Sequence, residues 1–277
     1  MKNKKNRVLL GAIAVIGLLR LADLFFNTDA ATGLLNDKLI WLRYLILGLP
    51  MAAAFVLSKK QKPQYLPGAL PDATLTLGYM VGAVGCIAGA VAAFVLFYMG
   101  QMGGLILACY ILQAVGGLWL AALSRKKKAN VWCGILLCVG LLGLALDRFM
   151  TNNSTFFRIG SSINVLAVLA AMMFMTRLLH LLEGNYEKKI ERAVYFYGMT
   201  AFYLCCALFL PQQLWSLLVS APLSAEVCAE SISLAGIGLL GLLCALRAGT
   251  LAGEKEHLFQ QEMQDREEKA PDTPDAE

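Results

Sequence analysis

Arg20 and Asp23 lie three residues apart inside an apolar stretch that runs from Val8 to Asn27. Residues three apart share one face of a helix, so these two side chains can pair. A charge left in lipid at the centre of a membrane helix costs about 2.5 to 3.5 kcal/mol on insertion scales, so both should face protein or water. Arginine offers forked donors to a carboxylate or phosphate, and aspartate can hold it in place or relay protons. The pair is therefore a candidate binding site for a polar or anionic group.

Other polar residues recur at a similar depth. Arg20 lies 13 residues beyond Arg7, about 20 Å along a helix, which places it in the outer half of a roughly 30 Å hydrocarbon layer. Pro211 interrupts another apolar stretch just before two glutamines, as in a broken helix that lines a cavity. We expect a charged vestibule in the outer half of the bundle, with eight candidate substrate-binding residues: Arg20, Asp23, Arg43, Asp147, Arg148, Asn164, Gln212 and Gln213.

A purely structural explanation accounts for the same charges. Arg20 with Asp23, or Asp23 with Arg43, would form a structural ion pair, and Arg148 would extend to the membrane interface. The kink at Pro211 would equally be packed in protein. The sequence leaves both explanations open, and activity that survives Asp23→Asn would favour the structural one.

No pattern indicates catalysis or a cofactor. The chain has two histidines and lacks an H-E-x-x-H motif, a G-x-S-x-G motif with a plausible histidine, and a P-loop. Its eight cysteines lie in or beside apolar segments with no C-x-x-C, which is typical of buried packing residues. We therefore expect no catalytic residue, no metal and no cofactor. We also expect no nucleic-acid partner, because no segment interleaves aromatic with basic residues.

The elements that carry these residues are membrane helices. Of the 277 residues, 58% are hydrophobic and 16% are charged, against about 45 to 50% and about 25% in soluble proteins. Apolar runs long enough to cross a bilayer, about 20 residues, recur along the chain. We predict an all-α integral membrane fold with eight transmembrane helices at 8–27, 39–58, 74–99, 103–123, 130–149, 160–182, 194–218 and 227–249.

The connections between these helices indicate orientation. Alternate connections place 17 lysines and arginines on one side of the membrane and three on the other. Cytoplasmic loops are enriched in Lys and Arg, so the pattern predicts a plasma-membrane protein with both termini in the cytoplasm. Basic loops beside anionic headgroups also account for the net charge of +5, with membrane lipids as partners.

An internal match predicts how the helices are related. Residues 8–28 align with residues 131–151, with nine of 21 positions identical. The basic start and apolar run of the first helix would also fit a cleaved signal peptide. The match favours a first helix that is retained. Four helices in each half would form a parallel 4+4 repeat with halves 1–125 and 126–253.

Small residues at helical spacing predict where helices approach closely. In membranes such residues let backbones come together where the hydrophobic effect cannot drive association. We expect contacts within one molecule, rather than a dimer interface, at Gly78, Gly82, Gly85, Gly89, Gly241, Ala245 and Gly249.

The chain divides into a polytopic membrane domain, residues 1–253, and a tail, residues 254–277. The tail carries nine acidic and three basic residues, which predicts a partly disordered cytoplasmic segment. It would solubilise this end of the chain, or serve as a docking peptide for a protein partner.

Two classes of function fit these features. The first is a small transporter or permease for a polar or anionic solute, favoured by charge in the outer half beside helix breakers. The alternative is a non-transporting signalling or assembly subunit, or a scaffold, that acts through protein partners. It would be recognised by a co-purifying partner that is lost on deleting residues 254–277. A lipid-linked enzyme comes third.

Overall fold

The computed structural model describes residues 2–27, 40–59, 73–125, 130–151, 159–182, 188–219 and 228–247. These residues form helices and contain no strand. The helices are α1 (Lys2–Asn27), α2 (Ile40–Ser58), α3 (Ala73–Tyr98), α4 (Gly104–Ser124), α5 (Val131–Thr151), α6 (Ile159–Leu182), α7 (Lys188–Phe202), the π-helix η1 (Tyr203–Phe209), α8 (Leu210–Val219), and a C-terminal helix (Cys228–Arg247).

The described part of the chain is a multi-pass helical membrane bundle. Seven segments are long and apolar enough to cross a bilayer: Asn6–Asn27, Ala73–Tyr98, Gly104–Ser124, Val131–Met150, Ser162–Leu182, Arg192–Trp215 and Cys228–Arg247. The sixth of these runs continuously through α7, η1 and α8. α2 also coincides with an expected span, but its apolar part, Arg43–Ser58, is shorter than the other seven. The acidic tail lies outside the described residues.

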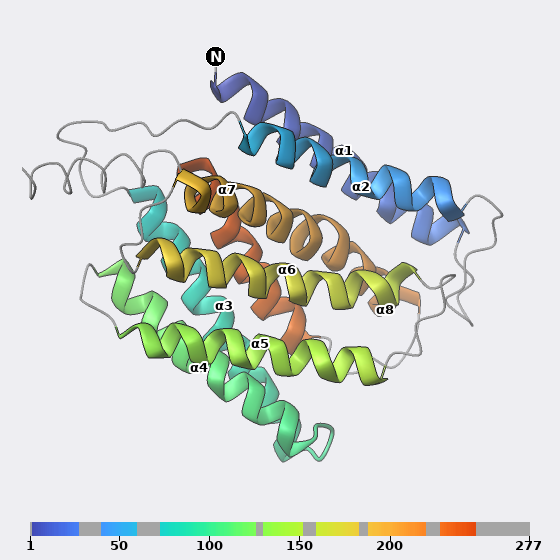
Figure 1. Cartoon of the computed structure of the whole chain (residues 1–277). Coiled ribbons are helices and arrows are strands. Elements are labelled where there is room, and N and C mark those ends of the chain that lie inside the picture. Colours follow the sequence, from blue (N-terminus) through green and yellow to red (C-terminus); the bar gives the residue numbers. More distant parts are fainter. Residues whose placement is uncertain are drawn as a thin grey trace, which may run out of the picture.

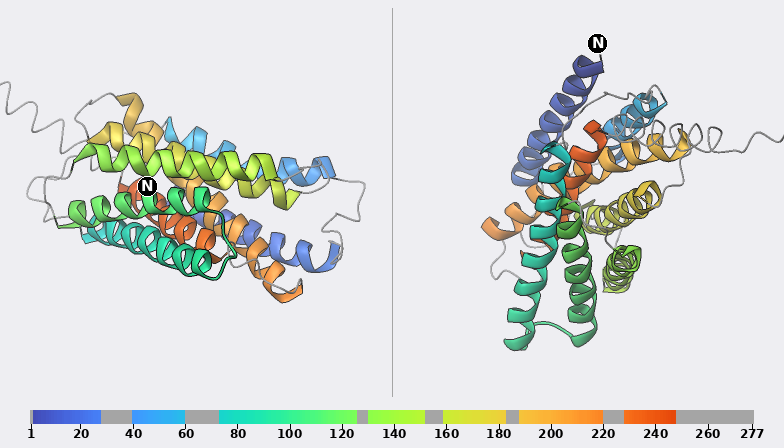
Figure 2. Two further views of the ribbon diagram at one scale, coloured as in Figure 1. Left: turned by 90° about the horizontal axis from the view of Figure 1, so that it is seen from below. Right: turned by 90° about the vertical axis from the view of Figure 1, so that its left-hand side faces the viewer.

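The helices form one bundle, in which α1 and α2 lie at one edge and α4 and α5 lie at the other (Figure 1). From α3 to α7, each helix packs against the next one in the chain. α1 and α2 instead lie together along the opposite edge, where α1 packs on η1 and α8 and α2 packs on α7 (Figure 1). The right-hand view of Figure 2 shows the same separation, with α1 and α2 at the top and α4 and α5 at the bottom. The α1–α2 pair is therefore peripheral and contacts the bundle mainly through one interrupted helix.

The C-terminal helix occupies the interior and is held by glycines. Gly85 of α3 faces Gly236 so closely that a Cβ on Gly85 would lie 2.7 Å from the Cα of Gly236. On the other side, a Cβ on Gly198 of α7 would lie 2.5 Å from the carbonyl oxygen of Gly241. Small residues expected to mediate close packing thus do so within this molecule, and Gly249 lies outside the described residues.

A π-helical stretch, rather than a gap, separates α7 from α8. Pro211 has no N–H, so the carbonyl of Ala207, four residues earlier, loses its ordinary helical donor. The π-helical stretch η1 lies directly before this proline, and such local adjustments accommodate proline in membrane helices. A Cβ on Gly17 of α1 would lie 3.0 Å from the Ala207 carbonyl oxygen. Gly17 therefore lets α1 approach the interrupted helix at the break.

The internal repeat remains a prediction. In a 4+4 arrangement, the contact of α6 with α7 should have a counterpart between α2 and α3. α6 packs along α7, but α2 packs on α7 as well rather than along α3. The packing of the two halves is therefore not equivalent at this position.

Candidate functional site

The site begins with one face of α1 near the end of the helix. Arg20 Nη1 donates a hydrogen bond to Asp23 Oδ2 at 3.0 Å, within an ion pair. One turn later, Asn27 Nδ2 donates to the other carboxylate oxygen of Asp23 at 2.9 Å. The Arg20 side chain is only 4% exposed, so a charged group lies buried where the sequence predicts the interior of a membrane helix.

Two further helices complete this group. Arg43, in the first turn of α2, pairs through Nη2 with Asp23 Oδ1 at 3.0 Å. Arg20 Nη2 donates to Gln212 Oε1 of α8 at 3.1 Å. We call Arg20, Asp23, Arg43 and Gln212 the arginine cluster. Two guanidinium groups share one carboxylate, so the cluster carries an excess of one positive charge.

A cleft of about 180 Å³ opens beside the arginine cluster. Its lining is Ile16, Leu19, Arg20 and Asp23 from α1, with Arg43, Ile46 and Leu47 from α2. The Nε of Arg20 is buried and has no hydrogen-bond partner among the described residues. A buried donor without a partner costs about 1 to 3 kcal/mol. An acceptor group placed in the cleft would remove that penalty.

η1 is hydrogen-bonded to Leu47, a residue of α2 that lines the cleft. Tyr203, a buried residue of η1, donates its hydroxyl to the carbonyl oxygen of Leu47 at 2.9 Å. The acceptor lies near Pro50, which removes the ordinary helical donor of the Ile46 carbonyl. Both proline-interrupted helices therefore border the arginine cluster.

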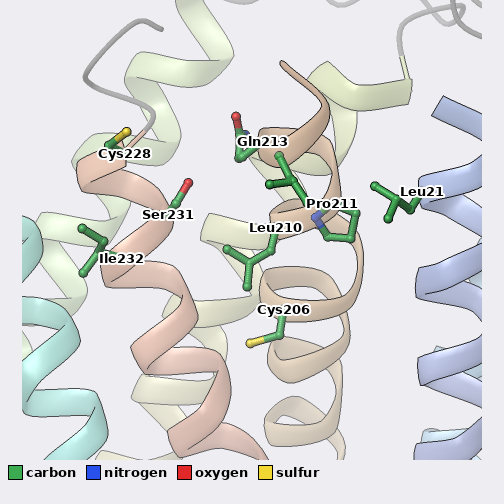
Figure 3. Close-up of a pocket in the computed structure, with 9 residues that line it drawn as sticks. Leu21, Cys206, Leu210, Pro211, Gln213, Cys228, Ser231 and Ile232 are labelled. Carbon is green, nitrogen blue, oxygen red and sulfur yellow. The ribbon is translucent and has the colours of Figure 1, made fainter. Parts of the chain in front are cut away.

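Gln213 belongs to a second group of contacts. Its Nε2 lies 3.4 Å from Asn164 Oδ1 of α6, a long hydrogen bond. Gln213 also lines a pocket of about 450 Å³ between α8 and the C-terminal helix. Figure 3 shows Pro211, Leu21 and Ser231 around this pocket, whose lining is mostly apolar. The interrupted helix thus borders a cavity on one side and contacts the arginine cluster on the other.

Arg148 lies in a separate contact group. Its Nη2 pairs with Glu230 Oε2 of the C-terminal helix at 2.9 Å, and Glu230 is only 2% exposed. The expected extension of Arg148 to the interface is replaced by a pair inside the bundle. α5, which carries Asp147 and Arg148, packs on α4 and α6 rather than on α1 or α2. The eight candidate residues therefore form distinct groups rather than one continuous vestibule.

Sequence reasoning missed two buried polar contacts. Glu230 was not among the candidates, although a carboxylate inside an apolar segment is itself a signal. Ser233 Oγ donates to Gln113 Oε1 at 2.5 Å, and both residues are fully enclosed between α4 and the C-terminal helix. The Gln113–Ser233 bond joins two helices and borders no candidate residue, so we assign it to packing.

The described residues contain no group of three His, Cys, Asp or Glu side chains placed to hold a metal ion. Comparison with protein-family models, with curated proteins and with solved structures finds no match. The function is therefore argued from the arginine cluster and the helices that build it.

Proposed function

We propose that this protein is a small transporter or permease that binds an anionic group of its substrate at the arginine cluster. The observation that carries the proposal is Arg20, whose side chain is buried, borders the cleft and keeps one donor unpartnered. A second guanidinium, from Arg43, lines the same cleft. Guanidinium groups suit carboxylates and phosphates because their donors form a planar fork.

The helices around the cluster supply elements that can change arrangement. α1 meets the rest of the bundle at η1 and α8, beside the proline break. π-helical segments often occur at functional sites, and interrupted helices line the substrate sites of many transporters. We propose that α1 and α2 move against α7, η1 and α8, and that eight spans place both termini in the cytoplasm.

Ion movement in proteoliposomes tests this function. The panel contains phosphate and carboxylate anions, from inorganic phosphate and acetate to lysophosphatidic acid and long-chain carboxylates. We expect one class to produce a charge movement on a solid-supported membrane. Arg20→Gln should abolish it, and Arg20→Lys should restore it partly because the charge returns without the fork. Arg125→Gln, at an exposed arginine after α4, should leave it unchanged.

Two results would contradict the proposal. One is the absence of a response to every anion in the panel by protein that elutes as a single folded species. The other is a response that survives Arg20→Gln. In either case the structural explanation of the cluster would stand, and the scaffold or assembly role would become the better hypothesis.

A further inference from the structure

The cleft beside the arginine cluster opens away from the bundle. On the inner side, the Arg20–Gln212 and Tyr203–Leu47 hydrogen bonds tie α1 and α2 to α8 and η1. On the other side, Leu19 and Ile46 line the cleft yet remain 60% and 39% exposed. No residue of α3, α4, α5 or α6 lines it. Access is therefore from the outer face of the α1–α2 pair.

That outer face is apolar. Val15 and Leu18 of α1, and Leu45 and Leu49 of α2, are large hydrophobic residues with more than half of their surface exposed. On a membrane helix such a surface contacts lipid chains, and in water it would be unfavourable. A ligand that enters between α1 and α2 at this depth therefore arrives through the lipid phase.

We infer that the anionic group bound by the arginine cluster is the phosphate or carboxylate headgroup of a lipid, whose acyl chain lies along the exposed face of α1 and α2. This inference rests on the proposed function and names its substrate class. The headgroup accepts hydrogen bonds from Arg20 and Arg43, and the excess positive charge selects an anion. The chain stays in hydrocarbon beside Leu19 and Ile46, so only the headgroup needs a polar site.

Spin-labelled lipids test the inference directly. The full chain is placed in phosphatidylcholine nanodiscs with phosphatidic acid labelled on its acyl chain, and phosphatidylcholine with the same label serves as the control lipid. Electron paramagnetic resonance then measures the motionally restricted fraction of each lipid. We expect a larger restricted fraction for phosphatidic acid than for phosphatidylcholine. Millimolar inorganic phosphate should not reduce it.

Matched variants locate the bound lipid. Arg43→Gln should weaken phosphatidic acid binding by about tenfold or more, the effect of losing a hydrogen bond to a charged group. Ile46→Trp should also weaken binding because it fills the cleft without removing a charge. Leu45→Trp, at the neighbouring 65% exposed position outside the cleft, should not. Arg192→Gln, at an exposed arginine of α7, is the charge control.

The possible failures separate the two proposals. The lipid inference is wrong if inorganic phosphate displaces the labelled lipid, or if phosphatidic acid and phosphatidylcholine are restricted equally. If Arg20-dependent charge movement persists in either case, the anion transporter stands. If the restricted fraction is the same in Arg43→Gln and Arg192→Gln, the cluster does not bind the headgroup. If the unmodified chain shows neither a preference for phosphatidic acid nor a charge movement, both proposals are overturned.

Discussion

Arg20 connects three helices through one guanidinium group. It pairs with Asp23 on its own helix and donates to Gln212 on α8, while Asp23 in turn pairs with Arg43 on α2. Removing Asp23 would leave two arginines facing each other without their shared carboxylate. The aspartate therefore stabilises the cluster whether or not a ligand is present, and its loss alone cannot establish a binding role.

Glu230 gives a residue-scale prediction that is independent of transport. Glu230→Ala should lower the free energy of unfolding by about 1 to 3 kcal/mol, because it leaves Arg148 without its buried carboxylate. Arg148→Met combined with Glu230→Met should be much less harmful, since apolar replacement of both members of a buried pair is often neutral. Thermal unfolding of the purified variants in detergent measures both effects. A double variant that is as unstable as Glu230→Ala, or more unstable, would contradict this account.

Depth along a helix explains what the sequence could predict about these residues. Counting from helix ends identified Arg20, Asp23, Arg43 and Gln212 as candidates at a similar level, and the structure joins them by hydrogen bonds and ion pairs. Depth does not specify the direction that a side chain faces around the bundle. The sequence therefore could not separate Arg148 from the cluster or identify Glu230 as its partner. Whether the cluster binds substrate stays a prediction.

At the scale of helices, glycine contacts and polar contacts hold different parts of the molecule. The C-terminal helix meets α3 and α7 at glycines, where backbones are close. The α1–α2 pair has one such close approach, at Gly17, and is otherwise joined to the bundle by side-chain hydrogen bonds that include Arg20–Gln212 and Tyr203–Leu47. Close backbone packing leaves little freedom, whereas a few polar bonds can exchange partners. The interior helix should therefore be the more rigid element.

Two glycine substitutions test this difference. Gly85→Ala should destabilise the protein by about 1 to 3 kcal/mol because the new methyl group would collide with the backbone of Gly236. Gly11→Ala is the matched control, since a Cβ on Gly11 of α1 would meet no atom within 4 Å. Unfolding in detergent should separate the two variants clearly. Equal stability would show that the α3 contact with the C-terminal helix is looser than described.

The positions of the helices could be predicted from the lengths of the apolar runs in the sequence. The irregularities within the helices could not. Each expected span corresponds to a helix or a continuous run of helices, because about 20 apolar residues must satisfy their backbone within the membrane. The largest differences are at the starts of two helices: α1 begins at Lys2 rather than at 8, and α7 begins at Lys188 rather than at 194. Pro211 indicated a break in the sequence, but the π-helical form of η1 depends on neighbouring helices and could not be predicted from it.

At the scale of the whole molecule, the number of crossings determines which face of the bundle carries the arginine cluster. Seven segments have the length and composition needed to cross a bilayer. The apolar part of α2 is shorter, and the number of crossings is eight only if α2 also crosses. If α2 crosses, the cluster lies toward the outer surface and both termini lie in the cytoplasm. If it does not, the positive-inside pattern fails for every later connection.

Thiol labelling from each side of the membrane tests this topology. In a chain without its native cysteines, Ala31→Cys should react with an impermeant reagent only from outside. Gln61→Cys and Ala270→Cys should react only from the cytoplasmic side. The expectation follows from the distribution of 17 and three basic residues between the two sides. Reaction of Gln61→Cys and Ala31→Cys from the same side would show that α2 does not cross.

The order of synthesis gives the α1–α2 ion pairs a further role. Gln212, which accepts a hydrogen bond from Arg20, is made 192 residues later. Asp23 lies three residues after Arg20 on α1, so Arg20 has a counterion once α1 has been made, and Arg43 can join the pair once α2 follows. The nascent hairpin therefore enters the bilayer with part of its charge already neutralised. Final docking to the interrupted helix then waits until Gln212 itself has been made.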